Sequence, residues 1–172
     1  LFTSESVAAG HPDKVCDNIS DAILDACISV DPRARVAVET FVKGMDDGSY
    51  IVVGGEITVH GEHVIDYEGI ARRTAAEIGY ISHDYGMAAD DSISCNVQIL
   101  VSQQSEDISQ GVTEGEGMFS AQGAGDQGMM FGYATKETAN YMPLALDISH
   151  KILQVLADLR REGTRISYLR PD

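Results

Sequence analysis

The spacing of the apolar residues changes from helical to strand-like within the first sixty residues, and this change most constrains the fold. Apolar side chains between residues 12 and 30 recur at steps of three and four, which places one apolar stripe along a helix. Residues 35 to 43 and 50 to 59 instead alternate, as strands do when one face is buried. The turn Asp46-Asp47-Gly48-Ser49 joins the two strands, so we expect an antiparallel hairpin beside a helix.

Local signals mark the ends of these and the following segments. Pro12 suits the first helical position, and Asp31 followed by Pro32 ends that helix. A second amphipathic helix is predicted from Asp66 to Ile78, with Gly79 as its C-cap. A further strand covers residues 94 to 102, where Leu100 on the second face suggests burial on both sides. The sequence therefore predicts an α+β fold, with an antiparallel or mixed sheet covered by helices on one face.

The composition changes after residue 102 and divides the chain. Residues 103 to 128 contain six glycines and few apolar side chains, which is typical of a long functional loop or a linker. Residues 129 to 134 then read as a short strand. Residues 146 to 161 read as a third helix, with an apolar stripe expected to face inward: Ile148, Ile152, Val155, Leu156 and Leu159. We predict an N-terminal α+β domain over residues 1–103, a flexible active-site loop over 104–122, and the incomplete beginning of a similar central domain over 123–172.

The composition also limits the class of protein. The 172 residues carry 12 basic and 27 acidic side chains, a net charge of −15, which disfavours binding to nucleic acid. A hydrophobic content of 44% excludes global disorder. No apolar run reaches the ~20 residues that span a bilayer, and the first residues do not resemble a signal peptide. Three widely spaced cysteines favour a reducing cytoplasm.

The motif His11-Pro12-Asp13-Lys14 places an imidazole, a carboxylate and an ammonium at the start of the first helix. A helix N-terminus favours anions, so a phosphate with its metal ion would suit this position. Asp13 could bind Mg²⁺, Lys14 could neutralise phosphate oxygens, and His11 could donate to developing negative charge. The alternative is that the motif serves only to cap the helix.

Two further groups of residues could bind a ligand. Glu39 and Glu56 stand on the predicted hairpin among hydrophobic neighbours, with Gly54 and Gly55 beside Glu56. These carboxylates could bind an ammonium group or a monovalent cation, or they could be edge-strand charges. Residues 123 to 128 place three glycines around Asp126 and Gln127, so this backbone could approach a ligand closely or form a flexible tether.

Taken together and in this order, the motifs resemble the S-adenosylmethionine synthetases, also called methionine adenosyltransferases. The resemblance covers essentially the whole chain and is carried by residues 2–7, 10–14, 39–43, 54–58, 123–128 and 131–135. It implies the synthesis of S-adenosylmethionine from ATP and L-methionine, with release of phosphate and pyrophosphate. It also implies dependence on Mg²⁺ and K⁺, and a homodimer or homotetramer whose active sites lie at the subunit interface.

The resemblance also assigns roles to individual residues. The family's catalytic and ATP-binding positions match four residues: His11, Lys14, Asp126 and Asp172. The Mg²⁺ ligand matches Asp13 and the K⁺ ligand Glu39, whereas Glu56 and Gln104 match methionine-binding positions. The family continues beyond these positions with a glycine-rich phosphate loop and further lysines, so we expect the 172 residues to be the N-terminal part and to be inactive alone. Two alternatives stay open: another Mg²⁺-dependent nucleotide hydrolase, and a non-enzymatic interaction module.

Overall fold

The computed structural model describes residues 2–105, 124 and 127–172. Its main elements are α1 (Pro12–Val30), β1 (Arg35–Met45), β2 (Gly48–Thr58), α2 (Tyr67–Ile78) and β5 (Cys95–Ser102). All five follow the predicted order and nearly the predicted bounds, and Gly79 caps the C-terminus of α2 as expected. Asp66, the expected first residue of this helix, is its N-cap. The short strands β3 (Ile81–Ser82) and β4 (Met87–Ala88), with the 3₁₀ turn η1 (His83–Tyr85) between them, were not predicted.

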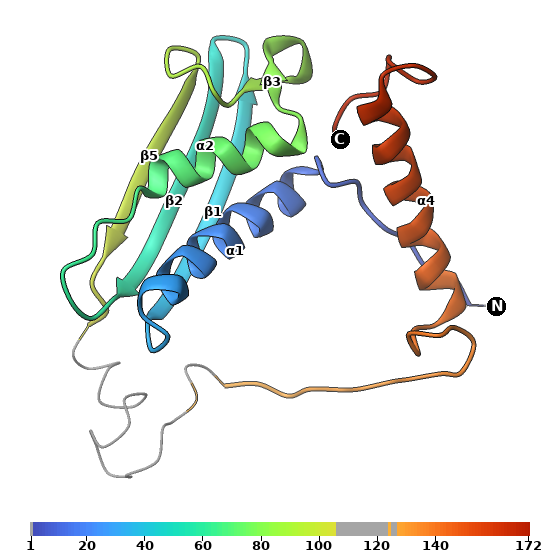
Figure 1. Cartoon of the computed structure of the whole chain (residues 1–172), viewed down its shortest axis with the longest axis horizontal. Coiled ribbons are helices and arrows are strands. Elements are labelled where there is room, and N and C mark those ends of the chain that lie inside the picture. Colours follow the sequence, from blue (N-terminus) through green and yellow to red (C-terminus); the bar gives the residue numbers. More distant parts are fainter. Residues whose placement is uncertain (1, 106–123, 125–126) are drawn as a thin grey trace.

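The three long strands form one mixed sheet in the order β1-β2-β5. β1 and β2 pair antiparallel, and β2 and β5 pair parallel, as the predicted α+β class allows. Both α1 and α2 lie on one side of this sheet (Figure 1). The core between the helices and the sheet contains side chains from α1, from α2 and from the strands, including Ile19, Ile23, Ile51, Val53 and Ala75. The fold class is therefore confirmed.

The other side of the sheet is not covered by any helix in the described part of the chain (Figure 1). We call this side the open face; alternate residues of the three strands form it, and they include Ala37, Glu39, Phe41, Lys43, Met45, Val52, Gly54, Glu56, Gln98 and Leu100. Phe41 is 60% exposed and Leu100 is 64% exposed. The predicted burial of Leu100 on this side is therefore wrong for the described part of one chain, because none of the described elements packs there.

The C-terminal part contains α4 (Leu144–Glu162), which stands apart from the sheet (Figure 1). The helix is confirmed, but its predicted inward stripe is wrong, because Ile148, Ile152 and Val155 are each about half exposed. The strand predicted over residues 129 to 134 is also absent. A strand needs a partner for its backbone groups, and no sheet edge in the described residues pairs with this segment. None of the described helices is both long and apolar enough to cross a membrane.

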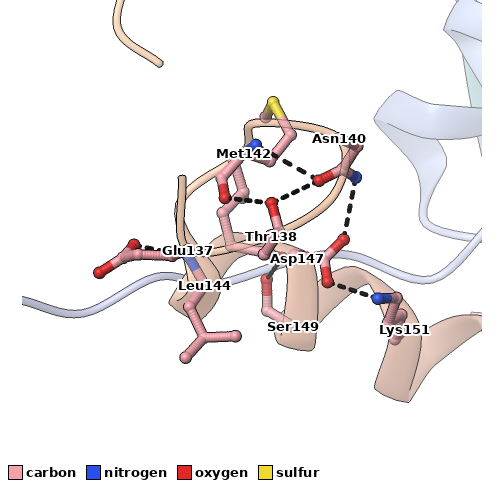
Figure 2. A network of polar contacts seen from close by, with 9 residues as sticks. Glu137, Thr138, Asn140, Met142, Leu144, Asp147, Ser149 and Lys151 are labelled. Carbon is pink, nitrogen blue, oxygen red and sulfur yellow. Dashed lines mark hydrogen bonds and ion pairs between the residues drawn. The ribbon is translucent and has the colours of Figure 1, made fainter. Parts of the chain in front are cut away.

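A polar network fixes the start of α4 (Figure 2). The Glu137 carboxylate accepts a hydrogen bond from the Leu144 backbone N–H, at 3.1 Å. This bond satisfies a helix N-terminus whose cap, Pro143, offers no side-chain acceptor. The buried Asp147 lies one turn into α4. Lys151 and Asn140 both donate hydrogen bonds to its carboxylate, and these bonds lower the pKa of Asp147. The network ties the loop before α4 to the helix itself.

Asp31 joins the end of α1 to the end of β2. Its Oδ1 accepts from the Arg33 backbone N–H at 2.9 Å, and its Oδ2 accepts from the His60 backbone N–H at 2.9 Å. The same Oδ2 lies 2.7 Å from Nδ1 of His60. These hydrogen bonds, those from the backbone first, lower the pKa of Asp31 to about 2.

The low pKa of Asp31 predicts a stability contribution that depends on pH. Because the folded pKa lies below the 3.8 that is usual for an aspartate, the contribution is fully present above pH 3.8 and is lost as the pH falls towards about 2. We expect Asp31→Asn to lower Tm by about 5 °C at pH 7 and by progressively less below pH 4. Thermal unfolding measured at pH 7 and again below pH 4 checks this, with Asp47→Asn in the exposed hairpin turn as the control. An equal deficit at both pH values would contradict it.

Candidate functional site at the α1 N-terminus

His11 is the N-cap of α1, and its ring has a defined role there. The Nδ1 atom accepts a hydrogen bond from the Asp13 backbone N–H at 3.2 Å. Because Nδ1 is the acceptor, the neutral imidazole carries its proton on Nε2. The side chain is 42% exposed, so this Nε2–H can donate to a ligand outside the helix end.

Asp13 and Lys14 lie in the first turn, beside His11. The Asp13 side chain is 92% exposed, with its Oδ2 4.0 Å from Nδ1 of His11. Lys14 is about half exposed, and its Nζ lies 3.3 Å from the Asp17 carboxylate. The first turn of the helix thus presents an accessible carboxylate and an ammonium group at the positive end of the helix dipole, which is an arrangement suited to a phosphate with a metal ion.

Lys14 also lines a cavity of about 750 Å³ between α1, α4 and the N-terminal segment. Glu5 and Ser6 line it from the N-terminal segment, and His150 and Arg161 line it from α4. A cavity of this size matches those that hold nucleotide-sized ligands. His150 Nδ1 lies 2.7 Å from the Ser6 hydroxyl, which joins α4 to the N-terminal segment. The sequence did not predict a site role for the four lining residues Glu5, Ser6, His150 and Arg161, because the cavity depends on contacts between segments about 140 residues apart.

The C-terminal residues of the chain meet the start of α1. The Gly10 backbone N–H donates to the Pro171 carbonyl at 3.0 Å, which brings residue 172 close to His11. The Asp172 carboxylate is about half exposed and lies 3.3 Å from Nε of Arg170. The structure therefore brings four predicted site residues to one region: His11, Asp13, Lys14 and Asp172.

A second group of predicted site residues lies on the sheet. Glu39 of β1 is opposite Gly54 of β2, so no side chain stands directly opposite its carboxylate, and Leu100 of β5 is the next side chain in that row. Glu56, two positions further along β2, is opposite Ser102 of β5. Gln104 follows at the end of β5, where its Oε1 accepts from Nε of Arg35 at 3.1 Å. Glu56 and Gln104 thus lie at the same end of the sheet.

The two groups lie on different sides of the fold. The Ser20 hydroxyl of α1 is 2.8 Å from the Thr40 hydroxyl of β1, so Thr40 faces the helix layer. Glu39 is adjacent to Thr40 in an alternating strand, and it therefore belongs to the open face. Asp126 and nearly all of the predicted loop 104–122 lie outside the described residues. Among the described residues, no cluster of three or more His, Cys, Asp or Glu side chains could hold a metal ion without help from a ligand.

Comparisons with known proteins agree in their descriptions. Residues 1–106 match the family model described as S-adenosylmethionine synthetase, N-terminal domain, and residues 121–172 match the model of the central domain. The chain is 54% identical over 172 residues to the S-adenosylmethionine synthase of Christiangramia forsetii, covering all of this chain and 38% of that protein. It is 52% identical to the synthases of Bacteroides fragilis, over 37% of that protein, and Sorangium cellulosum, over 38%. The chain thus spans well under half the length of these curated relatives.

Proposed function

Since the chain belongs to the S-adenosylmethionine synthetase family, we propose that the full-length protein makes S-adenosylmethionine from ATP and L-methionine. In this reaction the methionine sulfur attacks C5′ of ATP, the C5′–O bond breaks, and the triphosphate leaves. Hydrolysis of the triphosphate then yields pyrophosphate and phosphate. A neutral thioether needs no base to become a nucleophile, so catalysis rests on aligning sulfur with C5′ and on stabilising the charge that collects on the leaving group.

The observation that carries this proposal is the set of groups at the α1 N-terminus. The Nε2–H of His11 is free to donate because Nδ1 already accepts the Asp13 N–H. In our proposal this N–H group donates to an oxygen of the leaving triphosphate. Lys14, which lines the cavity between α1 and α4, adds a positive charge. Asp172 contributes to the ATP site from the segment that meets Gly10. Glu56 and Gln104 hold methionine at the end of the sheet, with the carboxylate facing the substrate ammonium group.

The donor groups fit the two metal ions that the family implies. Mg²⁺ commonly takes one or two carboxylates and completes its coordination with substrate phosphates and water. The single exposed carboxylate of Asp13, beside a helix N-terminus, fits that pattern. Glu39 on the open face, opposite a glycine, is our proposed K⁺ ligand. When bound, Mg²⁺ would neutralise triphosphate charge, while His11 and Lys14 orient the phosphates.

We also propose that a second copy of the chain covers the open face, giving a homodimer or a dimer of dimers. This face combines exposed apolar side chains with the Glu39 and Glu56 carboxylates, and no element of the described chain covers it. An active site at such an interface would use both partners. The three cysteines are free thiols, which is compatible with our prediction of a cytoplasmic location.

The requirement for methionine tests the proposed reaction against its alternatives. The full-length protein is incubated with ATP and Mg²⁺, with and without L-methionine, and phosphate and S-adenosylmethionine are quantified. We expect both products only when methionine is present. Equal phosphate release without methionine would favour a nucleotide hydrolase, and no turnover under either condition would favour an interaction module.

The Mg²⁺ role of Asp13 gives a separate prediction. Asp13→Asn in the full-length protein removes one negative charge but keeps the size of the side chain, so we expect the Mg²⁺ concentration for half-maximal activity to rise by about tenfold or more. Asp21→Asn, which changes an exposed carboxylate two turns further along α1, should leave the Mg²⁺ dependence unchanged. A normal Mg²⁺ titration for Asp13→Asn would leave Asp13 with a role in helix capping alone.

A further inference from the structure

Gly10, immediately before the His11 motif, is held from two directions by residues to which the sequence assigned no role. Its backbone N–H donates to the Pro171 carbonyl at 3.0 Å. Its carbonyl accepts a hydrogen bond from the Tyr80 hydroxyl, which is 8% exposed. A Cβ atom built on Gly10 would lie 2.3 Å from the Pro171 carbonyl carbon, so only glycine fits here. The entry to α1 is therefore fixed against the segment that carries Asp172.

Tyr80 can act as a fixed point because its own backbone is bonded on both sides. Its N–H donates to the Ala75 carbonyl at 3.1 Å, and its carbonyl accepts from the Ala89 N–H at 2.9 Å. Burial first, and then the Asp172 carboxylate, raise the pKa of Tyr80 above its usual value of 10.0, so the hydroxyl is a proton donor at neutral pH. A rigid, protonated donor thus meets the Gly10 carbonyl.

Arg160 joins α4 to the C-terminal end of α2, just before Tyr80. Its guanidinium donates to the Ile78 carbonyl at 2.7 Å, which satisfies an acceptor at the end of α2. Gly79 has φ +128°, and a Cβ atom there would lie 2.5 Å from the Arg160 guanidinium. The absence of a side chain at Gly79 therefore allows α4 to approach the end of α2. Tyr80, next in sequence, lies between this contact and Gly10.

We propose that Tyr80 is a positioning residue: through the Gly10 carbonyl, its hydroxyl holds His11 and Lys14 in register with Asp172. This inference rests on the proposed function and extends it to a residue that does not itself touch a substrate. His11 and Lys14, the proposed phosphate-binding groups, lie at the start of α1, whereas Asp172 is the last of the 172 residues. Their relative position depends on the Gly10 contacts, and a small displacement of aligned groups is costly for the rate.

The test replaces Tyr80 by phenylalanine in the full-length protein. Tyr80→Phe keeps the ring and removes only the hydroxyl that meets Gly10. The matched control is Tyr67→Phe, which removes a hydroxyl bonded to Cys27 at the opposite end of α2. Each variant loses one tyrosine hydrogen bond, a buried one at Tyr80 and one at the half-buried Tyr67, so both variants should show some general loss of stability.

We expect Tyr80→Phe to lower kcat/KM for ATP by about tenfold and to leave KM for methionine within about twofold. ATP affinity, measured by calorimetry, should weaken in the same variant. Hydrogen exchange in peptides covering residues 8–14 and 166–172 should become faster. Tyr67→Phe should change none of these quantities. Equal effects on ATP and methionine, or exchange and ATP affinity unchanged from the wild type, would overturn the positioning role.

The same measurements separate this proposal from the proposed function. If the wild type binds ATP but forms no S-adenosylmethionine, the proposed reaction fails, and ATP affinity with hydrogen exchange still decides the role of Tyr80. If Tyr80→Phe speeds exchange but behaves like Tyr67→Phe in ATP affinity and in kinetics, Tyr80 only stabilises the fold. If the wild type does not bind ATP, both proposals fail.

Discussion

His11→Asn in the full-length protein should lower kcat by about 100-fold or more with little change in Tm. Asparagine is among the best N-cap residues, and its Oδ1 can replace Nδ1 of His11 as the acceptor for the Asp13 N–H. What asparagine cannot replace is the donor at Nε2, which lies further from the backbone. Removing one donor to developing charge typically costs a factor of 10² to 10³ in rate. Steady-state kinetics and thermal unfolding measure the two effects separately.

Two controls distinguish donation to a ligand from helix capping. His11→Ala removes both functions, so it should lose activity and also about 1 kcal/mol of stability. Asp66→Asn exchanges one good cap for another at the start of α2, where Asp66 accepts from the Gly69 N–H at 2.9 Å, and it should preserve activity. Turnover of His11→Asn within twofold of the wild type would reduce His11 to a capping residue.

The sequence predicted those elements whose signals are local. The apolar spacing of α1, the alternation of β1 and β2, and the C-cap Gly79 all lie within or directly beside the segments that they define. Each of these patterns has a physical cause acting over a few residues. The same holds for the motif His11 to Lys14, because a helix N-terminus can be recognised from its own residues.

The errors fall where structure depends on a distant partner. The stripe of α4 was expected to face inward, but amphipathic spacing only says which residues share a side, and Ile152 and Val155 are 55% exposed. Residues 129–134 have apolar side chains typical of a strand, but no sheet edge formed by the described residues pairs with them. Tyr80 shows the same limit at the site, since its contact with Gly10 crosses 70 residues and leaves no local pattern.

The second copy that we propose on the open face predicts a large effect of a single substitution on assembly. Phe41 lies on β1 in the row that continues through Val52 and Gln98, and it is 60% exposed in one chain. If another copy covers this row, Phe41→Asp replaces a large apolar side chain in the interface by a carboxylate that must lose its hydration there. We expect the dimer to dissociate at concentrations about 1,000-fold higher than for the wild type, with loss of activity in dilute solution.

Light scattering coupled to size-exclusion chromatography, with activity measured over the same concentrations, checks this expectation. Val64→Asp is the matched control, because Val64 is fully exposed in the loop between β2 and α2, outside the strands that form the open face, and the change should alter neither mass nor rate. A monomer that regains activity as its concentration rises would link assembly to catalysis, as a site at the subunit interface requires. If Phe41→Asp stays oligomeric and active, the open face is not the interface, and Glu39 and Glu56 then need another explanation for their place on a partly apolar sheet.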